Sequence, residues 1–350
     1  MSSSGYSLRD RIVGAYVGSA AGDALGGPVE GWHAGMIKAV YGRVDRFLPY
    51  TRELKPGYAL HGEPGAITDD TYICNDFIDF FAAYRDPAER TAMVLARHLL
   101  ARARFEWWWP PAIVPLRKIE SGEMTIEETS KLLMGGGAAW WTPLGLVHAG
   151  KPADAYEETM RLSLIWRQPF EQNLISAVQA AVAAAVLPDA TVASVTDTLF
   201  EYAGPLARKL LERAQRIAHE HAGDLDGLVE GIYAEALVAE CSGELDGPMP
   251  ASAVATNPYK GATVLWAEQI PLAFASFVFG QGDFADSMFA CVNLGRDADS
   301  IAATTGRLAG ALVGLSGMPP DWIETLQTVN LAEMDLLAQG NRLADLSGVA

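Results

Sequence analysis

The sequence predicts an all-α protein that folds as a single compact domain of many helices. Apolar residues recur at helical spacing along most of the chain, whereas runs that alternate apolar and polar residues between tight turns are hard to find. Half of the 350 residues are apolar, so the chain can bury a sizeable core and is not disordered. Length alone leaves one large domain or two ordinary ones open.

A glycine stands at every fourth position of the first expected helix. On a helix these residues form one smooth stripe, which lets another backbone approach closely. Glycine costs a soluble helix roughly 1 kcal/mol per site relative to alanine, so the stripe requires a reason in packing or in a site. We expect this helix to be central. The stripe consists of Gly14, Gly18, Gly22 and Gly26.

Two stretches in the first half of the chain have strong helical signals. The apolar residues of 69–85 fall on one face of a helix, and Thr68 is its expected N-cap. Residues 174–187 are almost wholly Ala and Val. A helix without a polar face is a buried one, so we expect 174–187 in the core.

The last third of the chain predicts a helical hairpin and a buried helix. The hairpin consists of 271–279 and 284–292, joined by the Gly-Gln-Gly-Asp turn at 280–283. The buried helix spans 301–315. It has small packing positions four residues apart, at Gly306, Gly310 and Gly314.

The expected loops are too short and too unbiased in composition to be linkers. Two acidic segments, described below, lie near opposite ends of the chain, so a site that they share would tie these ends together. We therefore expect one domain over residues 8–340, preceded by a flexible N-terminus at 1–7. The loops are expected at 41–65, 107–115, 134–143 and 242–261.

The charge balance excludes one large class of partners. The chain has 26 Lys and Arg against 43 Asp and Glu, for a formal net charge of −17. Long-range electrostatics therefore oppose binding to nucleic acid or to an anionic membrane. Single anionic ligands are still compatible with this charge, because backbone N–H groups and bound cations act locally.

Cysteine usage and hydropathy indicate a cytoplasmic protein. Cys74, Cys241 and Cys291 are widely spaced and odd in number, which fits neither a disulfide framework nor a zinc cluster. The apolar stretch 12–21 imitates a signal peptide, but glycines interrupt it and Asp10 and Asp23 flank it. No other stretch approaches ~18 uninterrupted apolar residues, so we expect no membrane span.

Two acidic segments are the strongest chemical signal. They read Thr68-Asp69-Asp70-Thr71 and Asp297-Ala298-Asp299-Ser300, and each opens an expected helix. Capping and the helix dipole are sufficient to explain either segment alone. Together they offer four carboxylates and several hydroxyls, the hard oxygen ligands that Mg²⁺, Mn²⁺ or Ca²⁺ prefers, whereas zinc favours His or Cys. If the two helix starts converge, the mutual repulsion of the carboxylates implies a bound cation.

Two further segments carry weaker signals. Residues 22–30 end the glycine stripe in a Gly-Pro turn that would expose Glu30. The loop Gly135-Gly136-Gly137 runs into a helix and can cradle a phosphate, although a plain flexible turn explains it as well. Solvent exposure is the favoured interpretation of His219 and His221, and core or lid packing is at least as suitable as a pocket wall for Trp107-Trp108-Trp109.

These segments, in this order, resemble the ADP-ribosylglycohydrolase family. The resemblance extends from Asp10 to about Trp322, and its order and spacing make it specific. It is carried by Gly-Ala-Tyr-Val-Gly-Ser-Ala-Ala-Gly-Asp-Ala-Leu-Gly at 14–26, by Thr-Asp-Asp-Thr at 68–71, and by the stretches 135–145, 268–273 and 293–314.

The resemblance implies an all-α domain with a dinuclear Mg²⁺ or Mn²⁺ centre. Glu30 matches the catalytic glutamate of the family, and Asp23 matches an aspartate of the same segment that we expect to support the site. Gly135, Gly136 and Gly137 match the loop that wraps the diphosphate of ADP-ribose. The implied metal ligands are Thr68, Asp69, Asp70, Asp297, Asp299 and Ser300.

The departures from the family pattern fall mainly on the diphosphate site. The second acidic segment usually reads Gly-Asp-Thr-Asp-Thr, and here Arg296 replaces the glycine while the threonines are Ala298 and Ser300. The phosphate loop usually carries Asn where Gly136 stands, with Met-Arg often after it, where this chain has Trp140-Trp141. A Thr-His pair near the phosphates is replaced by Trp166-Arg167. The metal site is thus retained and the diphosphate site altered.

We therefore expect a metal-dependent glycoside hydrolase that cleaves an N- or O-glycosidic bond at C1 of ribose or ADP-ribose. Two cations would hold the ribose diol, and Glu30 would activate water or guide the diol. If Arg167 replaces the missing histidine, it can clamp a phosphate; if it faces solvent, Trp140 and its tryptophan neighbours would enclose a base. Two alternatives are a hydrolase of nucleosides or other N-ribosides, and a non-enzymatic relative. The expected partners are a small ribosyl substrate or an ADP-ribosylated protein, and a monomer is favoured.

Overall fold

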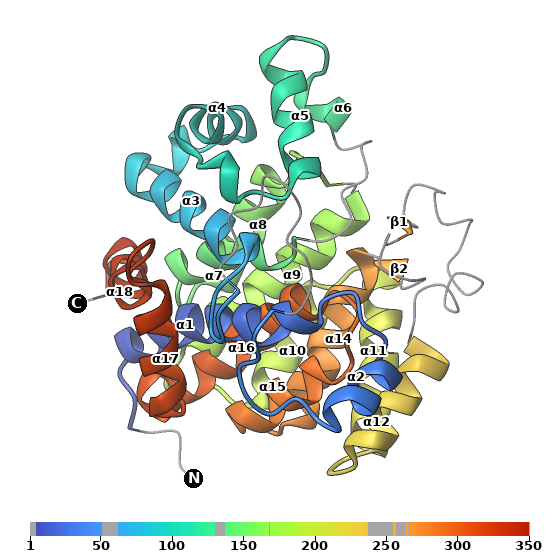
Figure 1. Cartoon of the computed structure of the whole chain (residues 1–350). Coiled ribbons are helices and arrows are strands. Elements are labelled where there is room, and N and C mark those ends of the chain that lie inside the picture. Colours follow the sequence, from blue (N-terminus) through green and yellow to red (C-terminus); the bar gives the residue numbers. More distant parts are fainter. Residues whose placement is uncertain are drawn as a thin grey trace.

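The computed structural model describes residues 5–50, 62–129, 137–167, 169–236, 255–256, 263–264 and 266–349. Helices make up nearly all of the regular structure in these ranges, which confirms the all-α class (Figure 1). The exception is one antiparallel pair of two-residue strands, β1 (Ala255–Thr256) and β2 (Thr263–Val264). β1 lies inside the expected loop 242–261, so the expectation of a strandless loop was wrong there.

The helices fall into an N-terminal and a C-terminal group. The first group is α1 (Leu8–Gly26), α2 (Ala34–Tyr41), α3 (Asp69–Ala83), α4 (Ala92–Arg102), α5 (Pro110–Glu120), α6 (Ile126–Thr129), α7 (Thr142–Val147), α8 (Pro152–Leu162) and α9 (Pro169–Ala185). The second group is α10 (Val192–Tyr202), α11 (Pro205–Glu220), α12 (Leu225–Gly231), α14 (Trp266–Phe279), α15 (Phe284–Val292), α16 (Ala298–Val313), α17 (Pro320–Asn330) and α18 (Leu336–Leu346). Short 3₁₀ or π turns lie between them at Gly27–Val29, Pro87–Glu89, Phe105–Trp107, Ala139–Trp141, Ile232–Ala236 and Leu315–Gly317.

Helices α1 and α16 form the centre of the fold and pack against each other along their lengths (Figure 1). Every residue of α1 from Arg11 to Gly26 is buried, the charged residues Arg11 and Asp23 included. Helices α14 and α15 pack on α16, and α18 packs on α1. α9 contacts α16 and is flanked by α8 and α10, so the two central helices are enclosed by other helices.

The glycines of α1 face the small residues of α16 at backbone-to-backbone distance. A Cβ added to Gly22 would lie 2.1 Å from the carbonyl oxygen of Ala302, and one added to Gly18 would lie 2.4 Å from that of Gly306. At the end of α1, a Cβ on Gly26 would lie 2.3 Å from the carbonyl oxygen of Ala298. The expected smooth stripe and its central position are therefore confirmed.

Several expected helix boundaries are confirmed or shifted. Thr68 caps α3, since its hydroxyl accepts a hydrogen bond from the backbone N–H of Asp70. The hairpin of α14 and α15 is present, and its turn places Gln281 at φ 49° and Gly282 at φ 92°. Helix α14 begins at Trp266, before the expected start at Pro271, and Pro271 is tolerated inside it.

Two other boundaries were wrong. The expected loop 107–115 contains the start of α5, because Pro110 fits the first helical position, where no N–H is needed. The expected domain limit at residue 340 cuts through α18, which continues to Leu346 and packs on α1. Residues 1–4 lie outside the described ranges. Ser7 is the N-cap of α1 and accepts a hydrogen bond from Asp10 N–H at 3.1 Å, so this residue belongs to the folded domain.

Four tryptophans form a cluster in the core. Trp108 lies 6.4 Å from Trp140 and 6.2 Å from Trp166 between ring centroids, and Trp141 lies 6.2 Å from Trp166. All four are at most 1% exposed. Trp108 also donates to the carboxylate of Asp76 at 2.6 Å, so core packing explains it without a ligand. None of the helices described here is long and apolar enough to cross a membrane.

We expect Gly22→Ala to lower the free energy of unfolding by more than about 2 kcal/mol. Overpacking of a core typically costs 1 to 3 kcal/mol, and here the new methyl group meets backbone that cannot rotate away. Gly35→Ala on α2 is the matched control, because its Cβ would approach only the His33 ring, at 3.3 Å. Urea unfolding of both variants measures the difference. Equal stability of the two variants would contradict the close approach of α1 and α16.

Candidate active site

Three carboxylates meet where α1 ends and α16 begins. One carboxylate oxygen from each of Glu30, Asp297 and Asp299 lies within 4.8 Å of the other two. Glu30 follows the 3₁₀ turn after α1, Asp297 immediately precedes α16, and Asp299 lies in the first turn of α16. The contact of Gly26 with Ala298 brings these chain segments together.

Backbone hydrogen bonds hold the Glu30 segment against the Asp297 segment. The N–H of Gly31 donates to the carbonyl oxygen of Arg296 at 2.5 Å, and the N–H of Arg296 donates to that of Trp32 at 2.8 Å. A bridge between His33 and Gly295 continues the pairing. The position of Glu30 relative to Asp297 is thus set by main-chain contacts, and substitution of a surface side chain does not alter it.

The start of α3 brings the other acidic segment to the same place. The hydroxyl of Ser300 donates to the carboxylate of Asp70 at 2.6 Å, although 230 residues separate the two in the chain. Asp69 is half-buried, and the charge of Glu30 is the largest electrostatic cause that raises its pKa. The structure therefore brings together residues of both predicted acidic segments and Glu30.

Asp23 holds the start of α3 in place. Its carboxylate accepts hydrogen bonds from the N–H and hydroxyl of Thr68, at 3.0 and 2.6 Å, and from the N–H and hydroxyl of Thr71, the first of these at 3.2 Å. Asp23 is fully buried. These contacts fit the supporting role that the sequence suggested for Asp23. The hydroxyl of Thr68 thus donates to Asp23 and also accepts the capping hydrogen bond of α3.

Electrostatic strain in the cluster shows in its pKa shifts. Burial and the neighbouring carboxylates raise the pKa of Asp69, Asp70 and Asp299 well above the usual range. Burial and Glu30 raise the pKa of Asp297 to about 6, against hydrogen bonds that lower it. Either protons or cations must therefore offset this charge.

Helix capping does not account for the cluster. Asp297 occupies the N-cap position of α16, but its side chain makes no capping hydrogen bond. Thr68 supplies the cap of α3, so capping does not require Asp69 or Asp70. The donor set consists of carboxylate and hydroxyl oxygens without His or Cys. Such a set fits Mg²⁺ or Mn²⁺ and does not fit zinc.

Arg296 explains one departure from the family pattern. Its backbone has φ 66°, the left-handed region that favours glycine, and glycine is the residue that the resemblance implied at this position. The guanidinium donates two hydrogen bonds of 2.8 Å to the two oxygens of Glu268. Burial raises the pKa of Glu268 to about 7, although Arg296 acts in the opposite direction. This bidentate pair holds the backbone just before Asp297, and the sequence analysis did not anticipate it.

The part of the glycine loop that the structure describes packs against a buried arginine and a tryptophan ring. Gly135 and Gly136 fall outside the described residues, whereas Gly137 has φ 76° and is described. A Cβ on Gly137 would lie 2.7 Å from the ring of Trp140 and 2.8 Å from Nη2 of Arg167. Trp140 therefore lies behind the loop, away from solvent, and side-chain bulk at Gly137 is excluded.

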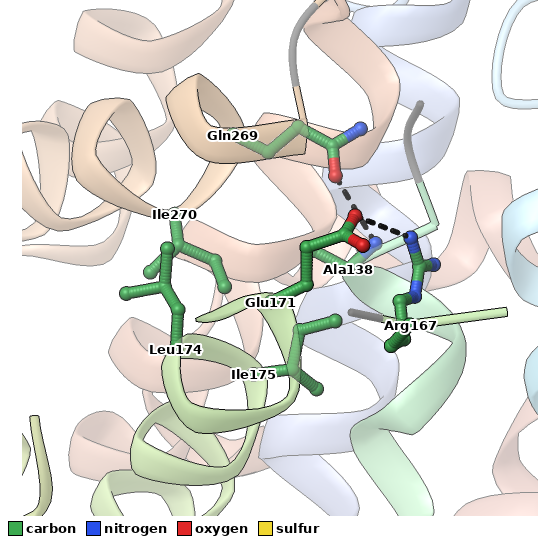
Figure 2. Close-up of a pocket in the computed structure, with 7 residues that line it drawn as sticks. All are labelled: Ala138, Arg167, Glu171, Leu174, Ile175, Gln269 and Ile270. Carbon is green, nitrogen blue, oxygen red and sulfur yellow. Dashed lines mark hydrogen bonds and ion pairs between the residues drawn. The ribbon is translucent and has the colours of Figure 1, made fainter. Parts of the chain in front are cut away.

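Arg167 is fully buried, so the solvent-facing orientation considered from the sequence is not the one observed. It forms an ion pair with Glu171 at 3.5 Å (Figure 2). Its guanidinium carbon lies 5.7 Å from the centroid of the Trp140 ring. Arg167 and Glu171 line a small cavity together with Ala138, Gln269 and three aliphatic side chains. The guanidinium of Arg167 thus lies beside Gly137, where a residue that binds phosphate is expected.

Other candidates lie apart from this site. His219 is exposed in the last turn of α11, as expected, whereas His221, the C-cap residue of this helix, is half-buried. The sequence analysis missed Gln269 and Arg307, which contact Ala138 from opposite sides. Their only signal was a long polar side chain within the mostly apolar helices α14 and α16, and this signal does not identify the partner.

Comparisons with known proteins point to one family. The sequence profile described as ADP-ribosylglycohydrolase matches residues 4–349. The chain is 24% identical over 364 residues to the ADP-ribosyl-dinitrogen reductase glycohydrolase of Rhodospirillum rubrum, covering 99% of both chains. It is 55% identical over 47 residues to the ADP-ribosylarginine hydrolase Tri1 of Pseudomonas putida, covering 13% of each. A solved ADP-ribosylglycohydrolase-related protein complex has the same fold, with a TM-score of 0.65 and 21% identity over 97% of this chain and 99% of that one.

We expect the melting temperature of the metal-free protein to fall as pH rises from about 4 to about 6. The folded pKa of Asp23 and that of Asp297 are about 6, and unfolding returns each to about 3.9. Between these values the folded state binds more protons than the unfolded state, so the free energy of unfolding decreases with rising pH and the stabilisation is lost above the folded pKa.

Added Mg²⁺ should raise the melting temperature more at pH 8 than at pH 5, because a cation then replaces protons in the carboxylate cluster. Scanning calorimetry with EDTA or with saturating Mg²⁺ measures both effects. A metal-free melting temperature that rises from about pH 4 to about pH 6 would contradict the assignment.

Proposed function

The chain belongs to the ADP-ribosylglycohydrolase family and is a hydrolase of glycosidic bonds to ADP-ribose, and we propose that its activity depends on divalent cations held by the carboxylate cluster. The observation that supports this proposal is the convergence of Glu30, Asp297 and Asp299 with the Asp70–Ser300 contact. A structural protein has no use for buried, mutually repelling charges, since they lower its stability. The substrate is ADP-ribose attached to a protein or to a small acceptor.

We assign the cations to the ligands that the sequence suggested. Asp69, Asp70, Asp297 and Asp299 supply charge, and Thr68 and Ser300 supply hydroxyl oxygens, for two Mg²⁺ or Mn²⁺ ions. When bound, such ions bind the cis-diol of a ribose and lower the pKa of a coordinated water.

Glu30 is the carboxylate that we assign to catalysis. It is half-buried at the edge of the cluster, while Asp23 is completely enclosed behind α3. Its carboxylate can accept a proton from an attacking water or hold the 2-hydroxyl of the ribose. Cleavage at C1 has oxocarbenium character, so the surrounding carboxylates stabilise the positive charge that develops there.

Gly137 and Arg167 form the end of the site that would recognise the diphosphate. Backbone N–H groups of a glycine loop bind phosphate oxygens, and a guanidinium can bind two of them at once. Glu171 neutralises Arg167 in this structure, so an incoming phosphate would share the guanidinium with Glu171. This arrangement favours ADP-ribose over a nucleoside.

A hydrolase of nucleosides or other N-ribosides is the second candidate. It is favoured by the positions that depart from the family pattern, where Trp141 and Trp166 stand in place of the polar residues that the resemblance implied. The burial of both tryptophans weakens it, because neither ring is placed to enclose a base.

We expect Asp299→Asn to abolish turnover at saturating Mg²⁺ while it raises the melting temperature of the metal-free protein. The variant removes one negative ligand from a cluster whose charges repel one another, and asparagine keeps an oxygen to accept from Ser300 N–H, as Asp299 does at 2.9 Å. Asp197→Asn on the exposed face of α10 is the control and should change neither property. Hydrolysis of an ADP-ribosylated peptide panel, followed by mass spectrometry, gives the activity. Wild-type turnover by Asp299→Asn would refute the ligand role.

Removing Arg167 and Glu171 together should weaken ADP-ribose binding more than about tenfold and leave ribose binding unchanged. A hydrogen bond to a charged group contributes about 1.5 to 3 kcal/mol. The double variant Arg167→Met with Glu171→Gln avoids leaving one buried charge unpaired. Calorimetry with ribose, adenosine and ADP-ribose in Mg²⁺ measures the effect. Equal affinity of the wild type for adenosine and ADP-ribose would favour the nucleoside hydrolase instead.

A further inference from the structure

Gln269 connects the two ends of the candidate site. It lies in the first turn of α14 and is 1% exposed. Its side-chain oxygen accepts a hydrogen bond of 3.1 Å from the N–H of Ala138, and its side-chain nitrogen donates to the carboxylate of Asp297. One buried amide therefore contacts both the residue after Gly137 and a residue of the carboxylate cluster. Figure 2 shows the first of these contacts, between Gln269 and Ala138.

One of the two contacts needs a hydrogen-bond acceptor at position 269 and the other needs a donor, and an uncharged amide group supplies both. Ala138 presents a donor, whereas Asp297 presents a negatively charged acceptor. A carboxylate at position 269 would meet only the first requirement, and a lysine would meet only the second. Because both hydrogen bonds are buried, the loss of either leaves a desolvated polar group without its partner.

Ala138 is held from its other side as well. Arg307 of α16 donates to the carbonyl oxygen of Ala138 at 3.0 Å and to the hydroxyl of Thr142 at 3.0 Å. Both polar groups of Ala138 are therefore bound to helices that carry or contact the carboxylate cluster. The direction of the peptide that follows Gly137 is fixed by this pair of contacts.

The residue before Gln269 secures the same segment. Glu268 binds the guanidinium of Arg296 through both of its oxygens, and Arg296 immediately precedes Asp297. Consecutive residues of α14 thus hold the backbone before Asp297 and the carboxylate of Asp297 itself. Gln269 in turn joins Asp297 to Ala138.

We propose that Gln269 is a positioning residue that couples cation binding at Asp297 to recognition of the diphosphate at Gly137 and Ala138. The inference rests on the proposed function and extends it, because it makes selectivity for ADP-ribose over ribose depend on a residue that the proposed function assigned to neither the cations nor the diphosphate. Gln269 orients Asp297 for the cation and Ala138 for the phosphates with the same amide group.

The test compares Gln269→Met with Gln179→Met. Methionine is close in size to glutamine and lacks both hydrogen bonds of the amide. Gln179 is a buried glutamine of α9 whose amide atoms have no hydrogen-bond partner among the described residues, so its replacement controls for loss of a core amide. Mn²⁺ affinity is measured by electron paramagnetic resonance, and binding of ribose and of ADP-ribose in saturating Mn²⁺ is measured by calorimetry.

We expect Gln269→Met to weaken Mn²⁺ binding about fivefold and ADP-ribose binding about tenfold, within the usual range for coupled sites, with ribose binding unchanged. Gln179→Met should leave all three affinities at wild-type values. A Gln269→Met variant that behaves like Gln179→Met, or that loses ribose and ADP-ribose binding equally, would overturn the inference.

Gln269→Glu separates the two contacts and also serves if the methionine variant does not fold. Glutamate keeps an oxygen for Ala138 N–H, so the preference for ADP-ribose over ribose should stay within about twofold of the wild type, where Gln269→Met loses about tenfold. Loss of this preference in Gln269→Glu would overturn the role of the Ala138 contact. Wild-type protein that binds neither Mn²⁺ nor ADP-ribose would refute the proposed function and the inference with it. Wild-type binding with unaltered Gln269 variants would refute the inference alone.

Discussion

The close approach of α1 and α16 is the constraint on which the rest of the structure depends. Four glycines let the two backbones touch, so the distance between the end of α1 and the start of α16 is set by atoms that cannot rotate away. Glu30 leaves one helix at this point, and Asp297 and Asp299 begin the other. The packing of the core therefore determines the separation of the carboxylates.

The third element of the site is attached by a different interaction. Asp23, on the same face of the fold, accepts hydrogen bonds from Thr68 and Thr71 and thereby fixes the start of α3. The buried carboxylate of Asp23 thus has a structural role, while the carboxylates of Glu30, Asp297 and Asp299 are available to bind ligands. The stability that the mutual repulsion removes is supplied by the surrounding apolar core.

The sequence predicted those features that depend on local spacing. A glycine at every fourth position, a threonine before two aspartates and a Gly-Gln-Gly-Asp turn specify their own helices and turns, and the structure has them. Bonds between distant residues could not be predicted in this way. Nothing in the sequence near Gln269 indicates Ala138 or Asp297 as its partners, and Arg296 stood out only as a departure from glycine. The pairing of Arg167 with Glu171 has the i, i+4 spacing of a helix, but its burial depends on the tryptophans packed around it.

The pairing of the first helix with one near the end of the chain also bears on synthesis. Helix α1 finds its glycine-matched partner only after residue 313 has been made, nearly the whole chain later. At about 5 to 20 residues per second, α1 emerges on the order of 15 to 60 seconds before α16. During that time an apolar helix without a charged face is exposed on the ribosome. Such an intermediate is prone to aggregate and is a natural client for a chaperone that binds nascent chains.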